Sequence, residues 1–388
     1  MNSVVYLSNS RIPSSMANSV QIMKMCEAMS LAGSNVTLVK PRRYNEFKNS
    51  KFNLFEFYDI EYPFQIKDLP YLDINTIEKL APNYLYRLFN YINSMIWENY
   101  LMNYYLNSHK GNMIFMRNTL HFAIDKITKH QIPSIIEFHS LPSDRYLNRY
   151  KKMFASNKNI YPLALTKGLA EDLSHNLKIN LSDILVLPGA VDISKYQFKS
   201  NFDNSNKNLT ITYVGSLIEN RGVAVLLESA KNLPNISIQI IGGTGKELDN
   251  ANKYIKSKNI QNVKLLGHKS QHEIYKYYNE SDILVLPMSG KEIHTKKYAS
   301  PNKLFEYMAS GKAIIASNID SINEVLTDGK DSILFDPDNS VDLTNKIKIL
   351  VENTDLRFRL GENAKKLSKN YSWEKRVLKI YNHVGNSF

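Results

Sequence analysis

The stretch SPNKLFEYMASGKAIIAS, residues 300–317, combines the start of a helix, the end of that helix and a buried strand. Ser300 is a good N-cap residue, and Pro301 suits the first position of a helix. Gly311 lies where a left-handed residue would end the helix. The run AIIAS, 313–317, is typical of a strand that is buried on both faces. A helix that leads into such a strand is the repeating element of an α/β fold with a parallel sheet.

Two polar residues of this helix need a different explanation. Lys303 and Glu306 lie in its first two turns, close to backbone N–H groups that have no partner inside the helix. The positive end of the helix dipole favours an anionic or hydroxylated ligand there. Leu304, Phe305 and Met308 fall on the face that we expect to pack in the core.

Size and charge restrict the class of protein. A chain of 388 residues with 43% hydrophobic residues predicts two domains. The 49 Lys and Arg against 37 Asp and Glu give a net charge of +12, which suits phosphorylated metabolites or lipid headgroups. The charges are spread along the chain and no nucleic-acid or zinc motif is found, so we expect no nucleic-acid partner. The single cysteine, Cys26, excludes an internal disulfide and is predicted to be a core residue.

The N-terminus MNSVVYLSNSR has an apolar run too short for a signal peptide, and no stretch is long enough to cross a membrane. We therefore expect a cytoplasmic protein. Residues 1–165 hold 19 Lys and Arg against 12 Asp and Glu, and residues 75–110 are rich in aromatic and aliphatic side chains. One or two amphipathic helices at 75–110 would suit peripheral contact with an anionic membrane, on the inner face of the cytoplasmic membrane. A packed core helix is the alternative.

Short apolar runs alternate with helical patterns in both halves of the chain, which predicts two parallel sheets covered by helices on both faces. The expected strands are 4–7, 36–39, 113–116, 134–138 and 161–166, then 209–215, 237–243, 263–267, 282–287, 313–317 and 332–335. The predicted organisation is an N-terminal α/β domain at 1–185, a linker at 186–208, a second α/β domain at 209–370 and a C-terminal helix at 371–388. Ligands of such sheets bind at the carboxyl ends of the strands, here in a cleft between the domains.

Several loops that follow predicted strands carry polar residues. In YVGSLIENRGVAVLLESA, 213–230, Arg221 and nearby N–H groups could hold a phosphate, although an ordinary loop with a surface arginine is also compatible. In the first half, the candidates to face the cleft are Ser14, Ser15 and Met16 of one loop, together with Arg117 and His139. A histidine satisfied within its own loop is the alternative for His139.

Taken together, YVGSLIENRGVAVLLESA, SDILVLP, SPNKLFEYMASGKAIIASNIDSINEVL and the late YSW resemble family 4 of the retaining glycosyltransferases in their order and spacing. The resemblance is strong across 205–388 and weaker across 1–200. It implies the GT-B fold, two facing Rossmann-like domains with a nucleotide-sugar cleft between them. The domain at 1–185 would be the acceptor side and the domain at 209–370 would bind the nucleotide sugar, while the helix at 371–388 would cross back to the first domain. The form SPNKLFEYMA is similar to a bacterial subgroup that assembles cell-surface polysaccharide, either lipopolysaccharide O-antigen or capsule.

The resemblance also implies roles for individual residues. Glu306 corresponds to the second glutamate of the family's paired motif, which binds the donor ribose; the first glutamate falls on Tyr298, and Glu292 or another loop group could replace it. His139 would approach the donor sugar, and Arg221 and Lys303 would hold the diphosphate. The implied donor-binding set is Gly215, Ser216, Arg221, Ser300, Pro301, Asn302, Lys303 and Glu306, and the implied catalytic set is His139, Arg221 and Lys303.

The implied function is metal-independent, cofactor-free transfer of a hexose-type sugar, with retention, from a nucleoside diphosphate to a glycan or lipid-linked acceptor. The nearest matches to a metal-binding Asp-x-Asp motif end at Asp282 and Asp338, where structural roles are expected. Two alternatives remain open, a GT-B nucleotide-sugar epimerase and a catalytically weak nucleotide-binding partner subunit. The second alternative arises because Tyr298 and Ser216 depart from the family pattern. The sequence does not specify the base, the sugar or the acceptor.

Overall fold

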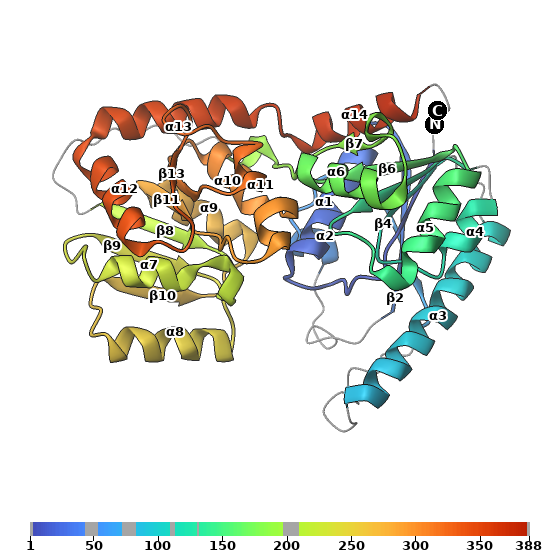
Figure 1. Cartoon of the computed structure of the whole chain (residues 1–388), viewed down its shortest axis with the longest axis horizontal. Helices are drawn as coiled ribbons and strands as arrows, with labels where there is room; N and C mark the ends of the chain where they lie inside the picture. Colours follow the sequence, from blue (N-terminus) through green and yellow to red (C-terminus); the bar gives the residue numbers. More distant parts are fainter. Residues whose placement is uncertain are drawn as a thin grey trace. The chain divides into compact units, whose positions relative to one another are not determined.

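The computed structural model describes residues 3–42, 53–71, 83–108, 113–129, 132–196 and 209–385 (Figure 1). The chain divides into two units. Unit 1 comprises Met1–Leu165, Leu169–Leu187 and Trp373–Phe388, and unit 2 comprises Thr166–Gly168 and Pro188–Ser372. The last helix of the chain therefore belongs to the same unit as the first strand. Parts of two sequence predictions lie outside the described residues, namely 197–208 of the linker and 75–82 and 109–110 of the aromatic helices.

Unit 1 contains a seven-stranded sheet in the order β3-β2-β1-β4-β5-β6-β7, in which every pair of neighbouring strands is parallel. Its strands are β1 (Ser3–Leu7), β2 (Asn35–Pro41), β3 (Gln65–Leu69), β4 (Met113–Arg117), β5 (Ser134–Phe138), β6 (Ile160–Ala164) and β7 (Leu185–Val186). The five strands predicted in this half are confirmed. Burial explains why they could be found, because β1, β4 and β5 are almost continuously buried apolar runs.

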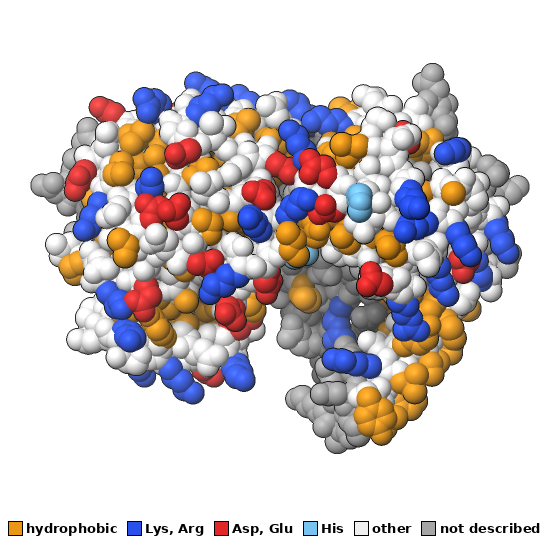
Figure 2. All heavy atoms as spheres, in the orientation of Figure 1, with side chains coloured by type: hydrophobic (Ala, Val, Ile, Leu, Met, Phe, Trp, Pro, Cys, Tyr) orange, Lys and Arg blue, Asp and Glu red, His pale blue; other side chains and the backbone are white. Residues whose placement is uncertain are grey.

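The helices of unit 1 lie between these strands along the chain, except α14, which follows unit 2. They are α1 (Ala17–Leu31), α2 (Leu54–Phe57), α3 (Asn83–Ser108), α4 (Ile124–Lys129), α5 (Asp144–Ser156), α6 (Lys167–Leu177), η2 (Leu181–Asp183) and α14 (Trp373–Val384). Helix α3 is the predicted aromatic helix, as one element of 26 residues. Its large hydrophobic side chains form an exposed stripe along the helix, which Figure 2 shows at the lower right.

Unit 2 contains a six-stranded parallel sheet in the order β10-β9-β8-β11-β12-β13. Its strands are β8 (Thr210–Val214), β9 (Ser237–Ile241), β10 (Val263–Gly267), β11 (Ile283–Leu286), β12 (Ala313–Ser317) and β13 (Ile333–Phe335). Its helices are η3 (Ile193–Tyr196), η4 (Glu219–Arg221), α7 (Val223–Ala230), α8 (Lys246–Ser257), α9 (Gln271–Glu280), the π-helix η5 (His294–Tyr298), α10 (Asn302–Ser310), α11 (Asp320–Asn323), α12 (Ser340–Glu352) and α13 (Thr354–Ser368). All six predicted strands of this half are confirmed.

Successive residues of the central strands in unit 2 enter two different cores. Ile314 of β12 belongs to a cluster with Leu304, Phe305 and Met308 of α10, whereas its neighbour Ile315 belongs to the cluster on the other face, with residues of α7 and α12. This division follows from the two-residue period of a strand. The prediction that these α10 residues face the core is confirmed.

Each sheet has one point where the strand order reverses direction. In unit 2 this switch point lies between β8 and β11, and in unit 1 it lies between β1 and β4. The helices that follow two such strands cover opposite faces of the sheet, which leaves room at the carboxyl ends for a ligand. A ligand-binding site in unit 2 is therefore expected at the loops after β8 and β11.

Candidate active site

The loops after β8 and β11 are joined by hydrogen bonds. The Ser289 N–H donates to the Asn220 carbonyl oxygen (3.1 Å), and Asn220 Nδ2 donates to Glu292 Oε2 (3.1 Å). The remaining side-chain acceptor of this residue, Asn220 Oδ1, is buried without a hydrogen-bond partner in the described part of the chain. A buried amide oxygen without a partner is uncommon. It marks the junction of the two loops as a place where a ligand or water can bind.

Glycines allow these loops to approach one another. Gly222, next to Arg221, has a φ of +68°, and a Cβ at this position would lie 1.6 Å from the Pro287 carbonyl oxygen. A Cβ at Gly242, in the loop after β9, would lie 1.9 Å from the Gly215 carbonyl oxygen. Side chains cannot be added at either position without moving the backbone. The predicted donor-binding residue Gly215 therefore packs against the backbone of Gly242. The carbonyl oxygen of the next residue, Ser216, accepts a hydrogen bond from the Tyr213 hydroxyl (2.7 Å).

Helix α10 begins one residue later than predicted. Its N-cap is Pro301 and its first residue is Asn302, so the prediction of Ser300 as the N-cap and Pro301 as the first helical residue was wrong. Ser300 Oγ instead accepts a hydrogen bond from the Gly189 N–H (2.8 Å). Proline can occupy the N-cap because that position has extended backbone and needs no N–H donor. Gly311 ends the helix with a φ of +73°, as predicted.

Lys303 and Glu306 lie on the same side of α10, one turn apart, and they contact each other directly. Lys303 Nζ donates to Glu306 Oε2 (2.7 Å), and the Tyr278 hydroxyl donates to the same oxygen (2.7 Å). Glu306 is 7% exposed, and burial together with this carboxylate raises the pKa of Tyr278 well above its ordinary value. A lysine ammonium has three N–H donors and a carboxylate has about four acceptor positions, so both groups can bind a ligand while they remain paired.

The structure also places the residue that stands where the family motif has its first glutamate. Tyr298 is a buried residue at the end of the π-helix η5, with its ring edge-on to His294 at 6.3 Å between centroids. Glu292 is exposed, and its carboxylate accepts the hydrogen bond from Asn220 described above. Glu292, which the sequence left unassigned, thus contacts the loop that carries Arg221. Short π-helical segments are rare and occur often at functional sites.

In unit 1, His139 belongs to a buried polar cluster at the end of β5. Glu137 Oε1 lies 2.6 Å from His139 Nε2 and accepts from Gln21 Nε2 (3.1 Å), while Glu137 Oε2 accepts from the Arg376 guanidinium (2.5 Å). Arg376 also donates to the Leu187 carbonyl oxygen (2.6 Å). Of Gln21, Glu137, His139 and Arg376, the sequence analysis identified only His139. No local signal could have found Arg376, because it lies 239 positions from Glu137.

The charges of this cluster determine the protonation state of the His139 imidazole. Burial alone would raise the pKa of Glu137, but the Arg376 guanidinium, with His139 and Arg117, holds it well below its usual range. Burial and then the positive charge of Arg117 lower the pKa of His139 to about 4. The imidazole is therefore neutral at pH 7. Because Nε2 faces a carboxylate, we place the proton on Nε2, which leaves Nδ1 as an acceptor.

The other first-domain candidates lie at the same edge of the unit 1 sheet. Arg117 is the last residue of β4, opposite Glu137 in the strand register, and its Nε is buried without a partner among the described residues. Ser14 is held through its backbone, because its N–H donates to the Tyr58 hydroxyl (2.7 Å). Ser15 and Met16 are exposed. The structure thus brings Arg117 and His139 together around Glu137.

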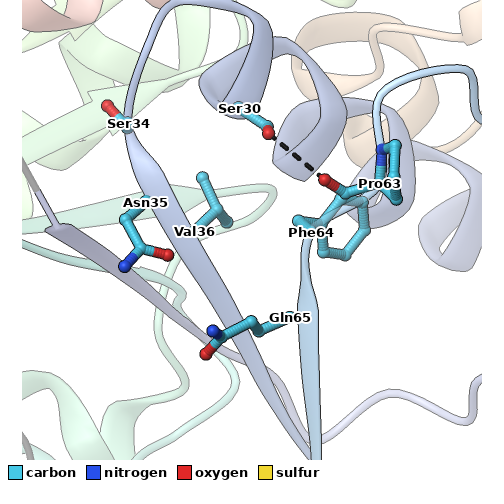
Figure 3. A pocket seen from close by; sticks show the side chains of 7 residues that line it. All are labelled: Ser30, Ser34, Asn35, Val36, Pro63, Phe64 and Gln65. Atoms are coloured by element: carbon cyan, nitrogen blue, oxygen red, sulfur yellow. Dashed lines mark hydrogen bonds between the residues drawn. The ribbon is translucent and has the colours of Figure 1, made fainter. Parts of the chain in front are cut away.

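The cavities identified in unit 1 are elsewhere. One of about 270 Å³ is lined by residues such as Ser30, Asn35 and Gln65, at the amino ends of β2 and β3, and the only hydrogen bond drawn across it joins Ser30 Oγ to the Pro63 carbonyl oxygen (3.4 Å, Figure 3). Another of about 560 Å³ lies near Ile160, at the amino end of β6. Ligands of parallel sheets bind at the carboxyl ends. Neither cavity is therefore a candidate for the donor.

The described residues include no helix that is both long enough and apolar enough to cross a membrane.

Comparison with known proteins agrees with this geometry. Residues 194–367 match the family described as glycosyl transferases group 1. An uncharacterised glycosyltransferase of Methanocaldococcus jannaschii is 27% identical over 66% of this chain and 70% of that protein. A lipopolysaccharide 1,2-N-acetylglucosaminetransferase of Salmonella typhimurium is 23% identical over 60% of this chain and 62% of that protein, which is less than two thirds of its length. The structure of Anabaena HepE in complex with UDP is similar with a TM-score of 0.72, at 15% identity, over 98% of this chain and 99% of that one.

These findings confirm the family resemblance and the GT-B fold that the sequence predicted. The family match covers the unit 2 loops that carry Arg221, Lys303 and Glu306, and the structural similarity extends over both units. Within this chain, residues 194–367 match the group 1 glycosyltransferase family.

Proposed function

We propose that the chain transfers a sugar from a nucleoside diphosphate to a glycan or lipid-linked acceptor of a cell-surface polysaccharide, with retention at the anomeric carbon. The observation that carries this proposal is the pairing of Lys303 with Glu306 at the start of α10, beside the switch point of unit 2. The name of the Salmonella relative supports a polysaccharide as the product, and the UDP bound to HepE supports a nucleoside diphosphate as part of the donor.

The donor would occupy the carboxyl edge of the unit 2 sheet. Its diphosphate would bind Arg221, the free N–H donors of Lys303 and the backbone N–H groups at the start of α10, near Ser300 and Asn302. Gly215 and Ser216 would allow the chain to approach the phosphates closely. The ribose would bind Glu306, which can accept from vicinal hydroxyls while it keeps its bond to Lys303.

The reaction breaks the bond between the anomeric carbon and the diphosphate oxygen. Charge builds up on the leaving diphosphate, so the cations stabilise the transition state more than the ground state. The acceptor oxygen then bonds to the anomeric carbon on the face that the diphosphate leaves, and its proton passes to a diphosphate oxygen. In unit 1, we assign to His139 a contact with the donor sugar, and to Arg117, Ser14, Ser15 and Met16 contacts with the acceptor.

Removing Glu306 should weaken nucleotide binding. Glu306→Ala should lower the affinity for a nucleoside diphosphate by about 1.5 to 3 kcal/mol, because the ribose loses a charged acceptor. Calorimetry with the ribonucleotide and its 2′-deoxy analogue isolates this contact. The wild type should prefer the ribonucleotide, and Glu306→Ala should not distinguish the two. An equal preference in both proteins would remove Glu306 from the ribose site.

Catalysis should not need a divalent metal. Arg221, Lys303 and the start of α10 together supply the charge that a metal would otherwise provide. The two Asp-x-Asp candidates have structural partners, since Asp282 accepts from the Thr210 N–H (2.8 Å) and Asp338 from the Gly290 N–H (3.0 Å). We expect initial rates to be unchanged by excess EDTA. Loss of activity in EDTA and its recovery on adding Mn²⁺ or Mg²⁺ would contradict the assignment.

A further inference from the structure

Helix α3 has an apolar face that none of the other described residues of unit 1 covers. Six of its large side chains are between 38% and 69% exposed, namely Tyr84, Leu88, Phe89, Ile92, Ile96 and Tyr100. We call these six residues the α3 apolar face. Their spacing of three, four or seven residues places them along one side of the helix. An exposed apolar stripe of this length marks an interaction site.

Three basic residues lie on α3 or against it, and the exposed Asp125 and Asp144 adjoin two of them in sequence. Arg87 lies on α3 itself and is exposed. The Arg145 guanidinium of α5 lies 4.0 Å from the centre of the Tyr91 ring, and Lys126 of α4 donates to the Asn99 carbonyl oxygen (3.2 Å). We call Arg87, Lys126 and Arg145 the basic rim. The acidic residue of α3, Glu98, is buried, where its carboxylate accepts from the Phe122 N–H.

We propose that the α3 apolar face and the basic rim together bind the surface of an anionic lipid bilayer. The apolar side chains would enter the boundary between headgroups and acyl chains, and the rim would contact the headgroup phosphates. Tyr84 and Tyr100, at the two ends of the face, are amphipathic side chains that suit this boundary. Stable membrane binding takes two signals, and this surface supplies an apolar one and an electrostatic one.

The same features argue against a second copy of the chain as the occupant. In a symmetric dimer through α3, each residue of the basic rim would approach the rim of the partner. Like charges at such short range disfavour association, and no exposed acidic side chain of α3 lies among the described residues to offset them. A lipid bilayer with anionic headgroups can contact the α3 apolar face with its acyl chains and the basic rim with its headgroup phosphates.

The test is flotation of the full chain with extruded vesicles. The wild type should bind vesicles of 70% phosphatidylcholine and 30% phosphatidylglycerol, bind pure phosphatidylcholine vesicles far less, and dissociate as NaCl rises from 100 to 500 mM. Leu88→Glu with Ile96→Glu should weaken binding about tenfold or more. Arg87→Gln with Arg145→Gln should weaken it about twenty-five-fold, at roughly fivefold for each charge.

Matched controls lie in unit 2. Val341→Glu changes a residue of α12 that is 66% exposed, and Lys276→Gln with Lys253→Gln removes two exposed lysines of α9 and α8. These variants should bind vesicles as the wild type does. Absence of wild-type binding, equal binding to neutral and anionic vesicles, or equal loss in the controls would overturn the proposal. A dimer that Leu88→Glu with Ile96→Glu dissociates, without vesicle binding, would assign the face to self-association instead. Nucleotide affinity should be unchanged in all of these variants, which separates this proposal from that of the donor site.

Discussion

Replacing Arg376 by alanine should lower the free energy of unfolding of unit 1 by about 3 to 5 kcal/mol. Arg376 is 4% exposed, and its guanidinium pairs with Glu137, which is 1% exposed. Its loss leaves the buried carboxylate with only neutral hydrogen-bond partners, Gln21 and His139, and with Arg117 as its remaining nearby positive charge, and it leaves the Leu187 carbonyl oxygen without this donor. Removing one partner of a buried ion pair costs far more than the net stabilisation by the pair.

The two tryptophans of the chain make this change measurable. Trp97 and Trp373 both belong to unit 1 and are buried, so the urea dependence of tryptophan fluorescence reports the unfolding of this unit. A second variant tests the cause of the loss. Arg376→Met with Glu137→Gln removes both charges, and it should recover much of the stability that Arg376→Ala loses. If the double variant is as unstable as Arg376→Ala, the effect comes from lost packing of α14 and not from the buried charge.

Neutralising Arg221 or Lys303 should lower kcat by a factor of about 100 to 1000 each, as removal of one transition-state donor does in other enzymes. The reason is that both cations act on charge that appears as the diphosphate leaves. Lys303→Gln is the better variant, because its amide can still donate to Glu306 and keep that buried carboxylate satisfied. Arg221→Ala carries no such complication.

The measurement is single-turnover release of nucleoside diphosphate, together with the dissociation constant of the donor. The dissociation constant should change much less than the rate. Lys253→Ala removes an exposed lysine of α8 in the same unit and should leave both quantities unchanged. A loss of affinity as large as the loss of rate would mean that the cations bind the ground state and do not contribute specifically to catalysis.

Buried strands were the most predictable part of the fold. The run AIIAS forms β12 at the residues predicted, because all five of its residues are buried between two layers of helices. Strand β3, QIKDL, was missed because it is an edge strand in which only Leu69 is buried. Strand β7 has two residues, too few for a pattern to appear.

Contacts within a few residues of each other were accessible from sequence, whereas distant ones were not. The spacing of Lys303 and Glu306 places them on one face of a helix, and the structure pairs them. Asn220 and Glu292 are 72 positions apart and meet only because β8 and β11 are neighbours in the sheet. The position of Ser300 was misjudged because its hydroxyl has a partner, Gly189, that is 111 positions away.

The transfer reaction itself can be tested by following the donor sugar. Thermal shift with a panel of nucleotide sugars first identifies the donor that stabilises the full chain. The labelled form of that donor is then incubated with the protein, with and without a bacterial envelope extract that contains lipid-linked glycans, and the products are separated by chromatography. We predict release of nucleoside diphosphate and an equal amount of sugar joined to the acceptor in the anomeric configuration of the donor. Conversion of the donor into an isomeric nucleotide sugar without the extract would indicate an epimerase, and tight binding of the donor without turnover under either condition would indicate a nucleotide-binding subunit; either result would contradict the account.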